Sequence, residues 1–480
     1  MPTASHPPTA PDGPTGQLAT WIAGFTLDQA PPAVQERAKY LLLDGFGCAL
    51  VGAQLPWTRL AVETITAFEP KGDTPIIGWG ATASTTVAAI LNAACIRAIE
   101  LDSGGIATYV HGSSGVIPPV LSLAHRNPKI TGAQVLEAAI VGYETGPRAS
   151  LGLHGGVAVT SRSWHPDPVF GNISCAAVSA KMLGLNAAQV EDALGHGCTQ
   201  SFGLMGTQFG ANSQRILSGW SGRNGLYAAF LAQAGYTGIK QVFELPYGGW
   251  LAAFGGGGKT PDPTQISSEL GKRWEVKNEG IKPYSCSGAL DAGIDALFDV
   301  NAKRPLKADE IKSIEFEFSS ANLDHVWWTL KRPLAMTQAQ MNIAYTAAVA
   351  VLDGEVLVAQ FAPDRLNADD VWDLIPRITA KRNAEFDKDP DPGHAVQSRV
   401  TVRFTDGKEL DAYRPAPKAI TTPTSNDGIV TKFRNVTDGV IDADRRDRIE
   451  QMILALDKQP SLKGLFDLLA PPVKSPFAET

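Results

Sequence analysis

Apolar residues recur at helical spacing through the first 276 residues of this chain, and strand-like alternation begins only after them. Residues 32–53, PAVQERAKYLLLDGFGCALVGA, combine this spacing with small residues that let helices approach closely. The Ala-rich residues 85–101 predict another core helix. Further helices are expected at 132–150, 172–184, 187–196 and 223–235. The first part of the chain is therefore predicted to be all-α.

Two of these helices carry recognisable start signals. Thr131 stands three residues before Gln134, which is the spacing of a capping box. Asn186 precedes AAQVEDALG and is a suitable N-cap residue. Both signals predict helices that begin at the next residue.

The pattern changes in the following 140 or so residues. Residues 311–318, IKSIEFEF, alternate apolar and polar side chains as a half-buried strand does. Residues 400–404 alternate in the same way and lead into Asp406-Gly407 and a second short run, which predicts a hairpin. Helical patterns at 338–352 and 367–380 lie between these strands. This part is predicted to be α+β.

Helical patterns return at the C-terminus, in DADRRDRIEQMILALDK and LKGLFDLLA. We therefore predict a mainly α protein with a large all-α helical domain formed by both chain ends, residues 18–276 and 419–480. A smaller α+β lid domain is expected at residues 277–418. Residues 1–17 are rich in proline and small polar residues and predict a disordered arm.

Composition excludes several classes of function. A length of 480 residues predicts two or three domains, and a net charge of −7 argues against nucleic acid as a partner. No uncharged apolar run reaches the ~18 residues of a membrane span. The five cysteines form no C-x-x-C pair, and the first residues lack the apolar core of a secretory signal. A cytoplasmic location is expected.

Motifs for common cofactors do not occur in this sequence. No G-x-G-x-x-G follows a predicted strand, so a nicotinamide or flavin site is not supported. There is no H-E-x-x-H, and the eight histidines are scattered. The sequence therefore predicts neither an organic cofactor nor a catalytic metal.

Polar residues in three places of the helical part could carry chemistry. An acidic cluster that contains Asp102 and Ser103 is followed by His111 beside glycines, which suits a pocket-lining loop. The alternative is a helix C-cap with a surface histidine. His165 precedes a proline, so it lies on an extended segment. Gln214 and Arg215 occupy a polar stretch, where the arginine is either a carboxylate clamp or part of a surface ion pair.

Two more candidates lie in the second half of the chain. Lys282 stands at the predicted junction between the domains, where a cleft is expected, although most lysines are merely solvated. Tyr345 lies in an otherwise apolar helix, and a tyrosine there is more often a core residue than a catalytic acid. Cations or donors that fix carboxylates, together with an acid or base, are what a cofactor-free enzyme needs to act on a polycarboxylic acid.

Taken in order, these segments resemble the MmgE/PrpD family from about residue 18 to the C-terminus, and most strongly its fungal cis-aconitate decarboxylases. The stretches that carry the resemblance are ELDSGG, HGSSG, WHPDPVFGN, CTQSFGLM, IKPYSCSG and AYTAAVAVLDG. The resemblance implies a homodimer with its active site between the helical domain and the lid, and no metal or organic cofactor.

The resemblance also implies roles for the candidate residues. The pocket-lining positions of the family's decarboxylases match His111, His165, Lys282 and Tyr345, and Asp102 matches its acidic motif. Carboxylates would be held by His111, Lys282 and Arg215, while a histidine or the tyrosine delivers a proton to carbon as carbon dioxide leaves.

Two positions depart from the decarboxylase pattern. Ser103 stands where that pattern has a second acidic residue, and Gln214 stands where it has a lysine. Losing one anion and one cation together preserves local neutrality but changes how many carboxylates the site binds.

Three functions are therefore considered. The first is a carbon–carbon lyase that converts cis-aconitate to itaconate and carbon dioxide. The second is a dehydratase or isomerase of an alkylcitrate-like or specialised-metabolite acid. The third is a non-catalytic ligand-binding protein that kept the fold.

Overall fold

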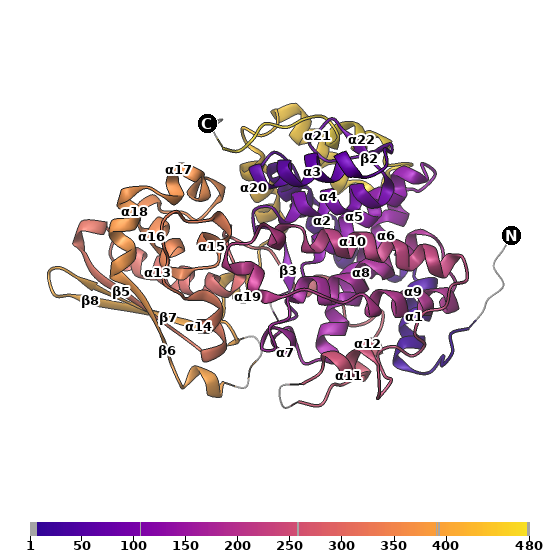
Figure 1. Cartoon of the computed structure of the whole chain (residues 1–480), viewed down its shortest axis with the longest axis horizontal. Helices are drawn as coiled ribbons and strands as arrows, with labels where there is room; N and C mark the ends of the chain where they lie inside the picture. Colours follow the sequence, from indigo (N-terminus) through magenta and orange to yellow (C-terminus); the bar gives the residue numbers. More distant parts are fainter. Residues whose placement is uncertain (1–6, 106, 257–258, 390, 392–393, 478–480) are drawn as a thin grey trace.

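The computed structural model describes residues 7–105, 107–256, 259–389, 391 and 394–477, and it shows a helical body beside a smaller part that contains a sheet (Figure 1). This arrangement confirms the predicted mainly α fold with two domains.

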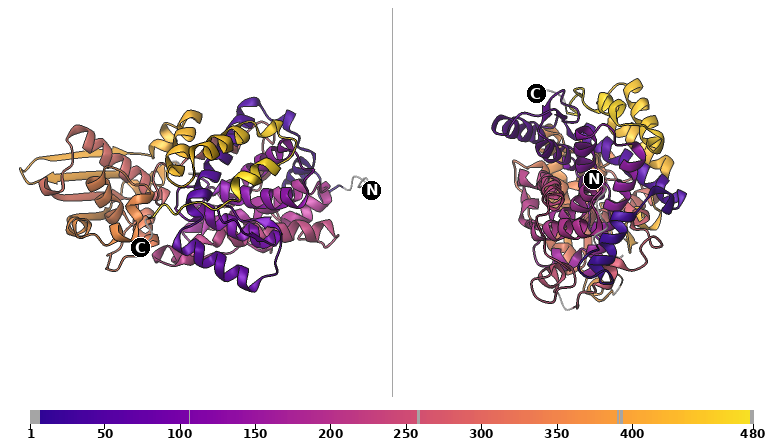
Figure 2. Two further views of the ribbon diagram at one scale, coloured as in Figure 1. Left: turned by 90° about the horizontal axis from the view of Figure 1, so that it is seen from above. Right: turned by 90° about the vertical axis from the view of Figure 1, so that its right-hand side faces the viewer.

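Helices from both ends of the chain form the helical body. Its main helices are α1 (Pro14–Gly24), α2 (Pro32–Gly52), α3 (Pro56–Phe68), α4 (Thr85–Arg97), α5 (Gly112–Arg126), α6 (Gly132–Gly152), α8 (Pro166–Met182), α9 (Ala187–Thr199), α10 (Leu217–Gln233), α20 (Asn426–Thr437), α21 (Ala443–Leu454) and α22 (Lys463–Leu469). Shorter helices are α7 (Val157–Thr160), α11 (Trp250–Phe254) and α12 (Thr264–Ser267). Both α20 and α21 pack on α2, so the last residues of the chain cover some of its first helices (Figure 2).

Small residues bring these helices together, as the sequence predicted. A Cβ atom on Gly52 would collide with the carbonyl oxygen of Cys95, so α2 and α4 touch through their backbones. The expected capping signals are confirmed, because the side chains of Thr131 and Asn186 accept hydrogen bonds from the third residues of α6 and α9. All five cysteines are buried and free.

The smaller part, called the lid below, contains a four-stranded sheet in the order β6-β5-β7-β8. The strands are β5 (Ile311–Phe318), β6 (Ile378–Arg382), β7 (Ser398–Phe404) and β8 (Glu409–Arg414). The central strand β5 pairs parallel with β6 and antiparallel with β7, and β7 and β8 form the predicted hairpin.

Helices complete the lid. They are α13 (Asp291–Lys303), α14 (Ser320–Val326), α15 (Met336–Gln340), α16 (Ile343–Asp353), α17 (Pro363–Leu366), α18 (Asp369–Leu374) and α19 (Lys418–Thr421). Contacts of α13 with β7 and β8, and of α16 with β6, cover the sheet.

Several predicted boundaries were wrong. The helix expected at 367–380 ends at Leu374, because Pro376 cannot continue it, and the next residues form β6. The helix expected at 338–352 is divided, since Asn342 caps the start of α16. Helix α1 begins at Pro14, inside the range 1–17 that was expected to be a disordered arm; residues 1–6 lie outside the described part.

The helical body also contains strands of two residues each, which the all-α prediction missed. Strands β1 (Thr74–Pro75) and β2 (Thr82–Ala83) pair with each other. Strand β3 (Gly104–Gly105) pairs with β4 (Glu279–Gly280), and this second pair joins the loop after α4 to the segment that leads into the lid. Among the described residues, no helix combines the length and apolarity needed to cross a membrane.

Candidate active site

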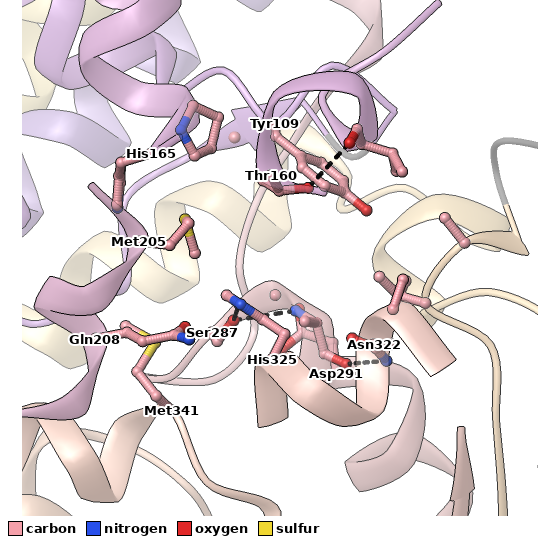
Figure 3. Close-up of a pocket in the computed structure, with 18 of the residues that line it drawn as sticks. Tyr109, Thr160, His165, Met205, Gln208, Ser287, Asp291, Asn322, His325 and Met341 are labelled. Carbon is pink, nitrogen blue, oxygen red and sulfur yellow. Dashed lines mark hydrogen bonds between the residues drawn. The ribbon is translucent and has the colours of Figure 1, made fainter. Parts of the chain in front are cut away.

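A cavity of about 1050 Å³ lies where the helical body meets the lid. Four of the predicted site residues line it, namely His111, His165, Gln214 and Lys282. Residues of α14 and of the start of α13 line the other side (Figure 3). The cavity is therefore built from both parts of the chain.

Arg97, the last residue of α4, organises the wall on the helical body. Its guanidinium is buried and lies 2.7 Å from Asp102 Oδ1 and 3.0 Å from Glu100 Oε1. Its Nε atom lies 3.4 Å from Asp167 Oδ2. These three carboxylates keep the pKa of Arg97 above its usual value despite burial. Sequence reasoning missed this residue, although an arginine ending an apolar Ala-rich helix was an available signal.

Glu100 connects three cations. Arg97 and Arg215 Nη1 (2.9 Å) contact its Oε1 atom, and Lys282 Nζ contacts its Oε2 atom at 3.1 Å. These cations lower the pKa of Glu100 well below its usual value, although burial opposes them. Glu100 also has φ = 53°, which a non-glycine residue rarely adopts. Such strain persists where the surrounding contacts determine the geometry, and it is common at functional sites.

Arg215 itself is a buried connector. Its guanidinium donates to Gln340 Oε1 and, at 3.2 Å, to Thr337 Oγ1 on α15 of the lid. It is not among the residues that line the cavity. The arginine thus joins the lid to Glu100, which differs from the predicted direct clamp on a carboxylate.

His111 directly precedes α5 and lines the cavity. Its Nδ1 atom lies 3.0 Å from Asp102 Oδ2 and 2.8 Å from Arg97 Nη1. Asp102 is fully buried and does not reach the cavity, so it orients the histidine.

His165 has the extended conformation expected before a proline and caps the start of α8. Its Nδ1 atom accepts a hydrogen bond from the backbone of Asp167, and the Gln214 amide lies 3.0 Å from its Nε2 atom. Burial, and then the charges of Arg97 and His111, hold the pKa of His165 well below its usual value. The ring is therefore neutral at neutral pH.

Ser103 lies behind the cavity wall rather than on it. Its hydroxyl donates to Glu279 Oε1 at 3.2 Å and lies 2.9 Å from Ser113 Oγ. Glu279 also accepts the backbone N–H of Gly112 at 2.9 Å. Burial raises the pKa of Glu279 to about 8, against these hydrogen bonds. Ser103 thus packs against an acidic residue that lies far from it in sequence.

Tyr345 is not brought to the cavity. It is fully buried in α16, and its hydroxyl donates a 2.6 Å hydrogen bond to the backbone oxygen of Gln360. Its surroundings are those of a core tyrosine whose hydroxyl is hydrogen-bonded, which was the alternative interpretation of this residue.

The lid contributes polar side chains that sequence reasoning did not find. Ser287 Oγ lies 3.2 Å from His325 Nε2, and both residues line the cavity beside Asn322 and Asp291 (Figure 3). Burial lowers the pKa of His325 to about 4. Ser287 belongs to the IKPYSCSG stretch, but Asp291, Asn322 and His325 come from segments without any motif, and only the folded lid brings them together.

Within the described ranges, no group of three His, Cys, Asp or Glu side chains has the arrangement of a metal site. The ionic groups of the wall are instead paired with one another. Three cations (Arg97, Arg215, Lys282) contact three carboxylates (Glu100, Asp102, Asp167). Such an arrangement can orient an anionic substrate through Lys282 and His111 at its cavity face.

Comparison with known proteins gives a consistent result. The MmgE/PrpD N-terminal domain matches residues 16–262, and the MmgE/PrpD C-terminal domain matches residues 284–458. The chain is 37% identical over 471 residues to the cis-aconitate decarboxylase-like protein oryM of Aspergillus oryzae, covering 95% of this chain and 97% of that protein.

Two cis-aconitate decarboxylases are also similar. The Aspergillus terreus protein is 35% identical over 484 residues, with 98% of each chain covered. The Homo sapiens protein is 25% identical over 409 residues, with 82% of this chain and 81% of that protein covered.

Proposed function

This chain belongs to the MmgE/PrpD family of lyases, and from that premise we propose that it decarboxylates cis-aconitate to itaconate and carbon dioxide. The observation that carries this proposal is the cavity wall in which Lys282 and His111 line the cavity while Glu100 and Asp102 hold them through ion pairs. These groups suit the capture of vicinal carboxylates by charge-assisted hydrogen bonds.

The geometry supports a division of roles. Lys282 and His111 hold carboxylates of the substrate, and Arg97 keeps both in place through Glu100 and Asp102. Because the three cations of the wall are already balanced by three carboxylates, a substrate anion binds by sharing Lys282 with Glu100. The neutral His165 and Gln214 supply uncharged contacts nearby.

The test is incubation of the purified protein with cis-aconitate and measurement of carbon dioxide and itaconate. Formation of both in equal amounts is expected. A parallel sample dialysed against a chelator should keep its activity, because the proposed chemistry uses side chains only. The proposal would be contradicted if no carbon dioxide were released, or if activity were lost on dialysis and restored only by added metal.

A second function is favoured by Gln214, which stands where the decarboxylase pattern has a lysine and contacts His165 through its amide. A pocket with one cation fewer suits an acid with fewer carboxylates, which a dehydratase or isomerase would process. Appearance of a conjugated double bond from a hydroxy acid, followed by ultraviolet absorbance, would favour this reaction.

We also infer a homodimer. Exposed apolar side chains on and after α10 support this inference, since Tyr227, Leu231 and Tyr236 are 49%, 38% and 65% exposed. Sedimentation at the mass of one chain would contradict it.

A further inference from the structure

Asp291 is a carboxylic side chain on the lid side of the cavity. It is the first residue of α13, only 4% of its surface is exposed, and it lines the cavity next to Ser287, His325 and Asn322 (Figure 3). In that view these lid residues lie across the opening from His165. A reacting molecule held on the wall of the helical body would thus have Asp291 on its other side.

The Asp291 carboxyl has no strong hydrogen-bond or ion-pair partner among the described residues. Its hydrogen-bond partner is the Cys286 thiol, at 3.9 Å from Oδ1, and thiols are weak donors. Across the described ranges, no ion pair within 4.0 Å involves Asp291. A buried carboxyl without a cation is more stable as the uncharged acid.

The charged groups around Asp291 do not reverse this preference for the uncharged acid. Burial raises its pKa well above the usual value, and so does the charge of Asp295 on the same helix; Lys282 and, from α20, Lys432 oppose the shift. The Lys282 ammonium is itself engaged by Glu100 at 3.1 Å. Burial therefore favours the protonated form of Asp291.

The neighbouring histidines are poorer proton donors. His165 has both ring nitrogens in contact with partners, and burial keeps it neutral. His325 is likewise neutral at pH 7, with a pKa of about 4. The N–H of a neutral imidazole is a much weaker acid than a carboxyl group, so it is the poorer proton donor to a developing carbanion.

On the basis of the decarboxylation proposed above, we propose that Asp291 is the general acid that protonates carbon. The bond between the substrate carbon and the leaving carboxylate breaks, and its electron pair moves through the double bond to the carbon that will be protonated. That carbon takes the proton of the Asp291 carboxyl, carbon dioxide leaves, and Asp291 becomes a carboxylate. A proton from solvent then restores the acid.

The position of Asp291 also stabilises the carboxylate that Asp291 becomes after it has given up its proton. The N-terminus of the 13-residue helix α13 stabilises a negative charge on its first residue. Lys282 adds a positive charge near the same group. Asp291 is thus neutral before the reaction, and the helix N-terminus and Lys282 stabilise its negative charge afterwards.

Asp291→Asn tests the proposal, because the amide keeps the shape of the side chain without an acidic proton. With cis-aconitate as substrate, kcat should fall about 10²- to 10⁴-fold while KM changes little. In the wild type, kcat should decline as pH rises through the pKa of Asp291, and this limb should be absent in the variant. Binding of tricarballylate, an unreactive tricarboxylate, should be the same in both proteins.

Asp299→Asn is the matched control, since Asp299 lies on the same helix and pairs with Arg414 away from the cavity. It should retain wild-type kcat. An Asp291→Asn enzyme with wild-type kcat and the same pH profile would overturn the proposal and leave His111 as the proton donor.

An infrared difference spectrum tests whether Asp291 is protonated, and this test does not depend on which substrate the enzyme uses. At neutral pH the wild type should show a carbonyl band of a protonated carboxyl that Asp291→Asn lacks. If the wild type releases no carbon dioxide from cis-aconitate, the substrate assignment fails, and this band still decides whether Asp291 carries the proton. Absence of the band overturns the assignment of Asp291.

Discussion

Lys282 and His111 are the residues on which the proposed carboxylate binding depends. Replacing either with alanine should reduce kcat/KM at least ~100-fold, which corresponds to about 2.7 kcal/mol of transition-state binding. The melting temperature should change little, because Glu100 keeps Arg97 and Arg215 as partners.

Kinetics and thermal unfolding of both variants check this expectation. Lys381→Ala is the control, since Lys381 is half exposed on β6, is not among the residues that line the cavity, and should behave as wild type. Fully active Lys282→Ala and His111→Ala enzymes would show that both residues are structural.

Gln214 and Ser103 are the two departures from the decarboxylase pattern, and they lie in different surroundings. Gln214 lines the cavity, so Gln214→Lys should raise kcat/KM for cis-aconitate about 10-fold or more through one added ion-paired hydrogen bond. Ser103 lies 3.2 Å from Glu279, so Ser103→Asp would bury two acids together and lower stability.

Carbon dioxide release by the wild type and the two variants separates these expectations. Efficient wild-type decarboxylation would mean that Gln214 does not limit the reaction. A Gln214→Lys enzyme without any gain would favour another acid as the substrate.

At the scale of single elements, helix α20 supports the acidic loop of the site. Lys432 donates a 2.7 Å hydrogen bond to the carbonyl oxygen of Leu101, between Glu100 and Asp102, and forms a 2.6 Å ion pair with the buried Asp44 of α2. Lys432→Met would leave Asp44 buried without its cation, which should cost roughly 3–5 kcal/mol of unfolding free energy.

Denaturant unfolding measures this loss. The double variant Lys432→Met with Asp44→Asn should recover much of the stability, because the buried charge is gone. Lys463→Met, at an exposed position of α22, should have no effect. A stable Lys432→Met protein would show that the ion pair is dispensable.

Local sequence signals predicted the elements well where neighbours in the chain decide them. The capping residues Thr131 and Asn186 lie where expected because a cap is satisfied within one turn. Residues 378–382 were missed because pairing with β5, which is distant in sequence, overrides their helical pattern. Asp291 and His325 could not be predicted as site residues, since only packing of the lid brings them to the cavity.

For the whole molecule, the buried Glu279 links stability to pH. Its pKa of about 8 in the folded protein lies above the ordinary value of 4.5 because burial disfavours the charged form. The stability that this group contributes is complete below the unfolded value and is lost as pH rises through 8. Glu279→Gln should therefore be more stable than wild type above pH 8, by roughly 5 kcal/mol, and similar near pH 5.

Thermal unfolding of both proteins from pH 5 to pH 9 tests this difference. Glu310→Gln, at a surface position where the carboxylate pairs with Arg304, should not reproduce it. Parallel stability curves for wild type and Glu279→Gln would show that folding does not raise the pKa of Glu279.

The contact between Lys432 and Leu101 spans 331 positions of the chain. During synthesis on the ribosome, the acidic loop emerges early, but α20 emerges only after the whole lid has been made. The helical body therefore remains incomplete until α20 has been made, and closing such a long loop is slow. A nascent chain released before residue 432 would lack the support of its acidic loop, so activity can appear only once the ribosome has delivered the C-terminal helices.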